Sequence, residues 1–127
     1  MLNQKRVLIA EDELFIALDL TWTVQDAGGR VVGPVARVAE ALEAVEQGEI
    51  DAAILDVNLK DGDSTPVAEA LARRRVPVVM HTGSEIPDRL RAQCPTLPVV
   101  GKPAEPLLLT RQLAQLLLRS DQQTRVA

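Results

Sequence analysis

Short apolar runs alternate with stretches of helical periodicity along the chain. Five runs are rich in Val, Ile, Leu and Ala and short enough to be single buried strands: residues 7–10, 31–33, 52–55, 76–80 and 97–100. Apolar residues at helical spacing predict helices at 13–27, 38–47, 64–75 and 106 to about 119. A further helix over 84–93 is less regular, because Pro87 interrupts it.

This alternation predicts an α/β fold. Strands of a parallel sheet that is covered on both faces are apolar throughout, as these runs are. We therefore expect a doubly wound five-stranded parallel sheet with helices on both faces. The chain has 127 residues, enough for one domain and too few for two. We expect that domain to span 1–119 and residues 120–127 to form a flexible tail.

Composition narrows the function classes. Hydrophobic residues make up 46% and charged residues 25% of the chain, which is typical of a globular domain. The net charge is −4 and aromatic residues are only 2%, so we expect no nucleic-acid partner. Cys94 is the single cysteine, which excludes an internal disulfide. The N-terminal apolar run is too short for a signal peptide or a membrane span, so we expect a cytoplasmic protein without membrane contact.

Polar residues follow four of the predicted strands. Glu11 and Asp12 follow the first strand, Asp56 the third, Thr82 the fourth and Lys102 the fifth. The carboxyl ends of parallel strands meet at one edge of a sheet, where function collects. Taken singly, Asp12 could cap a helix, Asp56 could be a turn residue and Lys102 a solvated charge. Those interpretations do not predict that three carboxylates, a hydroxyl and an ammonium converge.

Such a set of groups suits phosphoryl transfer to a carboxylate. Three clustered acids repel one another by up to about 4 kcal/mol per close pair. Mg²⁺ relieves this repulsion and prefers oxygen ligands, and an aspartyl carboxylate can accept a phosphoryl group covalently. The transferring group spreads its charge over equatorial oxygens, which a metal ion, an ammonium and a hydroxyl can each stabilise.

Four segments, in order, resemble the signature segments of bacterial two-component response-regulator receiver domains, in particular stand-alone receivers of the chemotaxis type. They are residues 7–13 (VLIAEDE), 54–59 (ILDVNL), 78–83 (VVMHTG) and 101–103 (GKP). The resemblance implies a flavodoxin-like sheet with strand order 2-1-3-4-5, and a signalling receiver rather than an enzyme. It also implies a sensor histidine kinase or a histidine phosphotransfer protein as partner, with output through protein contact.

The resemblance assigns the acids a joint role. Asp56 would be the phosphoacceptor. Mg²⁺ would be held by the carboxylates of Glu11, Asp12 and Asp56 and by the backbone carbonyl of Asn58.

The resemblance also implies that Thr82 and Lys102 contact the oxygens of the phosphoryl group. Thr82 would hydrogen-bond one of them and Lys102 would pair with another, with the Lys102–Pro103 bond cis. The sequence departs from the family at Val99, where an aromatic residue usually takes part in switching. We therefore hypothesise that the segment 83–93 changes order or position on activation instead, because Gly83 permits unusual backbone angles.

Three other interpretations stay open. A Mg²⁺-dependent phosphohydrolase would also pass through an aspartyl phosphate, but it usually has a second Asp where Asn58 stands. An interaction module of the same fold would not take phosphate at all. A phosphate sink for a shared kinase would carry the same residues as a signalling receiver.

Two helices carry more apolar residues than one core stripe needs, which indicates a partner surface. In the first helix we expect a core stripe of Leu14, Ala17, Leu18 and Thr21, with Ile16, Leu20 and Trp22 left over. The resemblance implies that the phosphodonor docks on this helix. For the Leu-rich last helix we expect a monomer or a weak dimer through its outer face. His81 should face away from the acids, because side chains alternate along a strand.

Overall fold

The computed structural model describes the backbone of residues 1–126 and the side chains of residues 1–121. The main strands are β1 (Arg6–Ala10), β2 (Arg30–Val35), β3 (Ala52–Leu55), β6 (Val78–Thr82) and β7 (Val99–Gly101). The helices are α1 (Leu14–Asp26), α2 (Val38–Glu46), α3 (Thr65–Arg73), α4 (Asp88–Gln93) and α5 (Pro106–Val126). Two short strands, β4 (Asn58–Leu59) and β5 (Gly62–Asp63), pair as an antiparallel hairpin.

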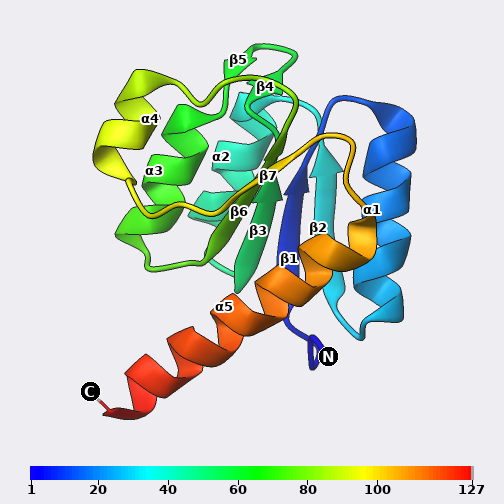
Figure 1. The fold of residues 1–127 in the computed structure, drawn as a ribbon, viewed down its shortest axis with the longest axis vertical. Coiled ribbons are helices and arrows are strands. Elements are labelled where there is room, and N and C mark those ends of the chain that lie inside the picture. The colour runs from blue at the N-terminus through cyan, green and yellow to red at the C-terminus, as the bar shows by residue number, and fades with distance from the viewer. Residues whose placement is uncertain (127) are drawn as a thin grey trace.

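The main sheet is parallel throughout, in the order β2-β1-β3-β6-β7. Since β6 and β7 are its fourth and fifth strands along the chain, the expected order 2-1-3-4-5 is confirmed. Helices α1 and α5 cover one face, and α2, α3 and α4 cover the other (Figure 1). Strands of this kind need helical crossovers, which the alternating sequence supplies.

The core has two halves, one on each face of the sheet. Alternate residues of β1 show the division: Leu8 and Ala10 pack towards α2 and α3, whereas Val7 and Ile9 pack towards α1 and α5. All four are at most 1% exposed. Full burial of such a Val, Leu or Ile side chain stabilises a fold by about 1.5–3 kcal/mol. The sheet therefore stays rigid at its centre and can hold polar groups at its edge.

The first helix packs in a different phase from the expected one. Its buried residues are Ala17, Leu20 and Val24, whereas Leu14 is 68% exposed. Leu14 and its neighbour Phe15 lie in the first turn, beyond the end of β1, where no neighbouring helix covers them. The expected stripe was therefore wrong for Leu14, and Leu20, which was expected to be left over, belongs to the core at 1% exposed. Ile16 also packs against the core, so of the expected surplus only Trp22 is exposed.

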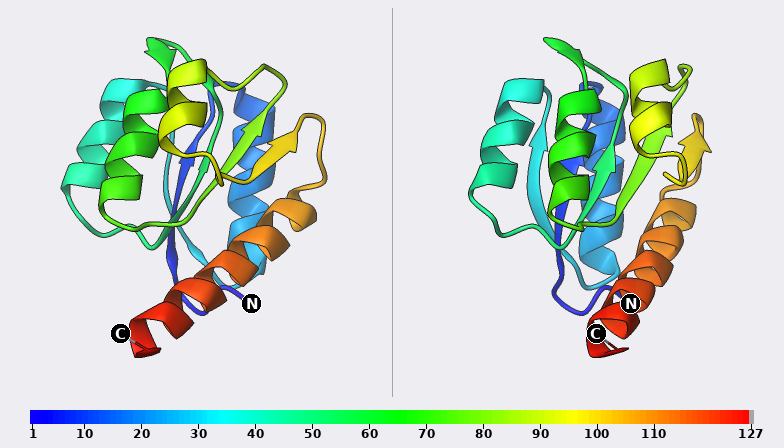
Figure 2. Two further views of the ribbon diagram at one scale, coloured as in Figure 1. Left: turned by 60° about the vertical axis from the view of Figure 1, so that its left-hand side comes forward. Right: turned by 90° about the vertical axis from the view of Figure 1, so that its left-hand side faces the viewer.

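The last helix is longer than expected. It continues to Val126, so the predicted end near Arg119 was wrong. The flexibility expected of residues 120–127 stays a prediction, and Ala127 lies outside the described residues. No Gly or Pro follows Pro106 to stop the helix. Its lower half extends past the sheet (Figure 2). Leu109, Leu113 and Leu117 are buried. In the part of the chain that the structure describes, no helix could cross a membrane.

The sequence periodicity did not predict two features of the fold, the β4–β5 hairpin and the full length of the second strand. The β4–β5 hairpin is too short to produce a strand pattern. The second strand runs beyond residue 33 through a cis Gly33–Pro34 bond.

The less regular helix expected over residues 84–93 is present, but it begins only after Pro87, as α4. A bidentate ion pair ties it to α3, because Arg89 donates to both carboxylate oxygens of the buried Glu69, at 2.8 and 3.3 Å.

Candidate functional site

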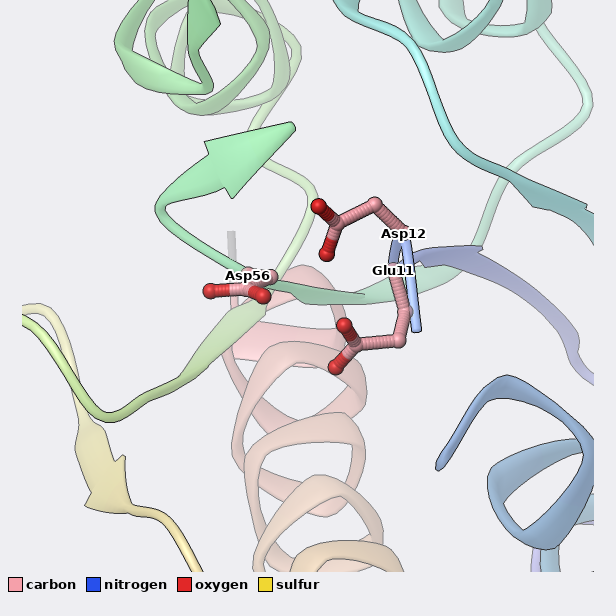
Figure 3. A group of neighbouring side chains, drawn as sticks. All are labelled: Glu11, Asp12 and Asp56. Atoms are coloured by element: carbon pink, nitrogen blue, oxygen red, sulfur yellow. The ribbon is translucent and has the colours of Figure 1, made fainter. Parts of the chain in front are cut away.

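Three carboxylates meet at the carboxyl edge of the sheet (Figure 3). Because β1 and β3 run side by side in register up to Ala10 and Leu55, the residues that follow them emerge together. The Asp56 N–H extends this pairing by donating to the carbonyl of Ala10 at 2.9 Å. Glu11, Asp12 and Asp56 each offer a carboxylate oxygen, and these atoms lie within 4.8 Å of one another. The convergence of the three predicted acids is therefore confirmed.

The Lys102 ammonium bridges two of these acids. Its Nζ lies 2.9 Å from Oδ2 of Asp56 and 2.9 and 3.1 Å from Oε1 and Oε2 of Glu11. Glu13 lies further out, at 3.8 Å. The side chains of Lys102, Glu11 and Asp56 are only 17%, 1% and 7% exposed, so water screens these pairs weakly. The Lys102–Pro103 bond is cis, as the resemblance implied.

Burial controls the charge state of this cluster. It raises the pKa of Glu11 to about 7, while the hydrogen bond from Lys102 lowers it and the charge of Asp56 raises it further. Burial also acts to lower the pKa of Lys102, but its hydrogen bonds to Asp56 and Glu11 outweigh burial and raise it. Without a metal ion, Glu11 therefore keeps its proton up to about neutral pH.

The donor set fits a hard divalent cation. Oε1 of Glu11 is buried, and among the described residues its polar contact is the ion pair with the Lys102 ammonium at 2.9 Å rather than a hydrogen bond, so this oxygen lies inside the cluster as a candidate metal ligand. Asp12 is half-buried beside it. The N-cap of α1 is Glu13, with no side-chain cap hydrogen bond, so the capping interpretation of Asp12 is wrong. Carboxylate oxygens are the ligands that Mg²⁺ prefers.

The predicted Thr82 and Asn58 lie at the same edge, joined through a residue that the sequence did not indicate. Thr82 is buried at the end of β6, and its hydroxyl oxygen accepts the N–H of Ser84 at 3.1 Å. Ser84 Oγ in turn accepts a hydrogen bond from the side-chain amide of Asn58 at 2.7 Å. The N–H of Asn58 lies 3.4 Å from Asp56 Oδ1. The role of its carbonyl as a metal ligand stays a prediction.

His81 lies on the side of the sheet that α1 covers. It is 4% exposed and lines a cavity of about 460 Å³ with Glu13, Ile16, Asp19 and Leu20 and with residues 102–104 and 106. That it faces away from Glu11, Asp12 and Asp56 stays a prediction. Burial, followed by the charge of Lys102, lowers its pKa, so the imidazole is neutral at neutral pH.

Comparison with known proteins decides the family. Residues 7–106 match the response regulator receiver domain. The chain belongs to this family. Receiver domains are signalling modules of two-component systems. Receiver domains generally bind Mg²⁺ at an acidic pocket.

Individual relatives agree with this assignment. The solution structure of SdrG from Sphingomonas melonis Fr1 is 44% identical, with a TM-score of 0.76, over 92% of this chain and 99% of that one. A response regulator receiver protein from Sinorhizobium medicae is 28% identical, with a TM-score of 0.79, over 92% and 97%. The transcriptional regulatory protein PdtaR of Mycobacterium tuberculosis is 37% identical over 79 residues, which are 61% of this chain and 38% of PdtaR.

The raised pKa of Glu11 predicts a pH-dependent metal affinity. Below about pH 7 the ion must displace a proton from Glu11, so the apparent Kd for Mg²⁺ should rise by up to about tenfold per pH unit. Calorimetric titration in buffers of different ionisation enthalpy measures the released proton. Glu11→Gln should remove that release, and an unchanged release in this variant would contradict the assignment.

The raised pKa of Glu11 also predicts how metal-free stability depends on pH. The free energy of unfolding should fall as the pH rises from about 4.5 to about 7, because the folded state binds the proton more tightly than the unfolded state.

Crowding of the carboxylates predicts opposite effects of one substitution. Asp12→Asn should weaken Mg²⁺ binding, because it removes a ligand charge. It should leave the metal-free melting temperature unchanged or higher, because it relieves repulsion. Thermal melting with and without Mg²⁺ measures both effects. A clear loss of metal-free stability would show that the Asp12 side chain supports α1 after all.

Proposed function

We propose that this chain is a phosphoryl-accepting receiver that is phosphorylated on Asp56, with Mg²⁺, by a histidine kinase or a histidine phosphotransfer protein. One observation carries the proposal. The Asp56 carboxylate lies within 4.8 Å of two other carboxylates and 2.9 Å from the Lys102 ammonium. This arrangement offers a nucleophile, a set of metal ligands and a cation to the same small volume.

The chain's own groups divide the work of the transfer. An oxygen of Asp56 forms the new bond to phosphorus as the P–N bond of the donor's phosphohistidine breaks, and the electron pair leaves with the imidazole nitrogen. Lys102, which now bonds Oδ2 of Asp56, follows the developing charge onto a phosphoryl oxygen. The Thr82 oxygen accepts from the Ser84 N–H, which leaves the hydroxyl hydrogen to bond a second phosphoryl oxygen. Mg²⁺, when bound by Glu11, Asp12 and Asp56, neutralises negative charge on both partners.

The exposed apolar side of α1 supports docking of the phosphodonor there. Leu14 is 68%, Phe15 81% and Trp22 56% exposed. Leu14 and Phe15 lie in the first turn of α1, directly after the acids that follow β1, so a protein that binds at Asp56 can bury them. Burial of such side chains against a partner supplies affinity in proportion to apolar area.

Two forms of output use the same site. A signalling receiver contacts a target after phosphorylation, whereas a phosphate sink only drains a shared kinase. Exposed Leu107, Leu108 and Leu118 on α5 favour a protein contact, with a target or as a weak dimer. A pulldown with and without a beryllofluoride mimic separates these forms. The alternative phosphohydrolase finds less support, because the Asn58 amide is bonded to Ser84 and is a poor proton donor.

The phosphosite is testable directly. Incubation with acetyl phosphate and Mg²⁺ should label Asp56 alone, and omission of Mg²⁺ should cut the labelling sharply, because three acids would then repel the incoming phosphate. Intact-mass measurement after a short incubation detects the added phosphoryl group. Asp56→Ala should lose it and the exposed Asp26→Ala should keep it. Labelling that survives in Asp56→Ala would sink the assignment.

The segment 83–93 should change order or position on phosphorylation. Val99 carries no aromatic ring and is 49% exposed, so movement of Thr82 must pass through the bonded Ser84 into this segment. Its helix α4 has only six residues, and its Ser84–Asn58 hydrogen bond is exposed. Amide hydrogen exchange with and without beryllofluoride should therefore differ most between residues 82 and 93.

Thr82→Ala provides the control for this switch. It should abolish the exchange difference and leave Asp56 able to accept phosphate. Equal protection of the segment in both states would instead make the apolar face of α5 the better candidate for output.

A further inference from the structure

The hairpin that carries Asn58 is fastened at its tip to a helix that takes no part in the acid cluster. The carboxylate of Asp61, between β4 and β5, accepts the N–H groups of Val38 and Ala39 at 2.5 and 3.1 Å. These are the first two residues of α2, whose own N-cap, Arg37, makes no side-chain cap hydrogen bond. Asp61 therefore caps α2 from a distant part of the chain.

Charge and backbone strengthen this attachment. The N-terminus of a helix carries partial positive charge, which favours a carboxylate. The hydrogen bond from Val38, which outweighs the others, lowers the pKa of Asp61, and the nearby Arg37 lowers it further. Next to it, the N–H of Lys60 donates to the carbonyl of Ala36 at 3.0 Å. The tip of the hairpin is thus held by two hydrogen bonds to α2 and by one to Ala36, which precedes this helix.

On the side of the acid cluster the polar contacts of the hairpin are weak, while the side chain of the neighbouring Leu59 is buried in the core. Each strand has two residues, and so short a hairpin is not stable alone. Asn58 makes a long N–H bond of 3.4 Å to Asp56 and an exposed side-chain bond to Ser84. The Ser64 N–H closes the base by donating to the carbonyl of Val57 at 2.8 Å. The position of the Asn58 backbone therefore depends on the burial of Leu59 and on the attachment at Asp61.

We propose that Asp61 is a positioning residue for the metal site: by capping α2 it fixes the hairpin and with it the Asn58 carbonyl that binds Mg²⁺. The inference rests on the proposed function, since it assumes that this carbonyl is a ligand. Asp61 itself does not touch the ion. Its removal raises the entropy that the hairpin must lose when Mg²⁺ binds, so it weakens the affinity without removing a ligand.

The experiment compares Asp61→Ala and Asp61→Asn with Glu40→Gln, which removes an equal charge from the first turn of the same helix. Asp61→Ala should raise the Kd for Mg²⁺ about three- to tenfold, because most of the free energy of a helix cap here fixes the hairpin. Asp61→Asn should fall between Asp61→Ala and the wild type, since it keeps one acceptor oxygen. Glu40→Gln should bind like the wild type.

Kinetics and exchange separate positioning from general support. In acetyl phosphate labelling, Asp61→Ala should need more Mg²⁺ but reach the wild-type rate at saturation, and amide exchange over residues 58–63 should speed up without metal. A lowered melting temperature with an unchanged Kd for Mg²⁺ would overturn the proposal and leave Asp61 a helix cap only. An effect of Glu40→Gln equal to that of Asp61→Ala would overturn it too, in favour of long-range charge. Failure of the wild type to bind Mg²⁺ would instead refute the proposed function.

Discussion

The Lys102 ammonium holds together two buried carboxylates, Glu11 and Asp56, that would otherwise repel each other in a poorly screened site. Burial, more than the charge of Asp56, raises the pKa of Glu11 to about 7, so without metal Glu11 keeps a proton up to about that pH. In the folded state without metal, attraction to Lys102 therefore opposes the repulsion and the burial of the carboxylates at this edge of the sheet. A divalent ion or a new anionic group changes the balance of these charges, and a domain that responds to phosphorylation needs a site that responds in this way.

The rigid centre of the sheet withstands the repulsion between these carboxylates. Every residue of β3 and β6 is buried, and the two halves of the core lock the register of the strands from both faces. Repulsion at the carboxyl edge cannot push the strands apart without exposing this apolar surface. The segment that follows β6 can move more easily, because its residues 83–85 are exposed. The buried strands of the sheet thus hold the acid cluster in place, and the exposed segment after β6 can move in response to a change in that cluster.

Periodicity predicted the five strands and the acids that meet at their ends, because these depend on local pattern and on the geometry of parallel sheets, whereas the strand order came from the resemblance to receiver domains. It misplaced Leu14, since a helix that begins beyond the sheet leaves its first turn uncovered, which periodicity cannot reveal. It also stopped α5 near Arg119, where the apolar stripe ends although no residue breaks the helix. The contacts of Ser84 and Asp61 were not predictable, because each joins residues more than 20 positions apart through one side chain.

The exposed surface of α1 has a spectroscopic consequence. The chain contains no Tyr and a single Trp, Trp22, which is 56% exposed on this helix. Intrinsic fluorescence of the protein therefore comes from one indole on the face that we assign to the phosphodonor. A docked protein would remove water from that indole and shift its emission to the blue, whereas rearrangement of α4 on the opposite face of the sheet would leave the emission unchanged. The sequence thus carries its own optical probe, which distinguishes events on the two faces without a label.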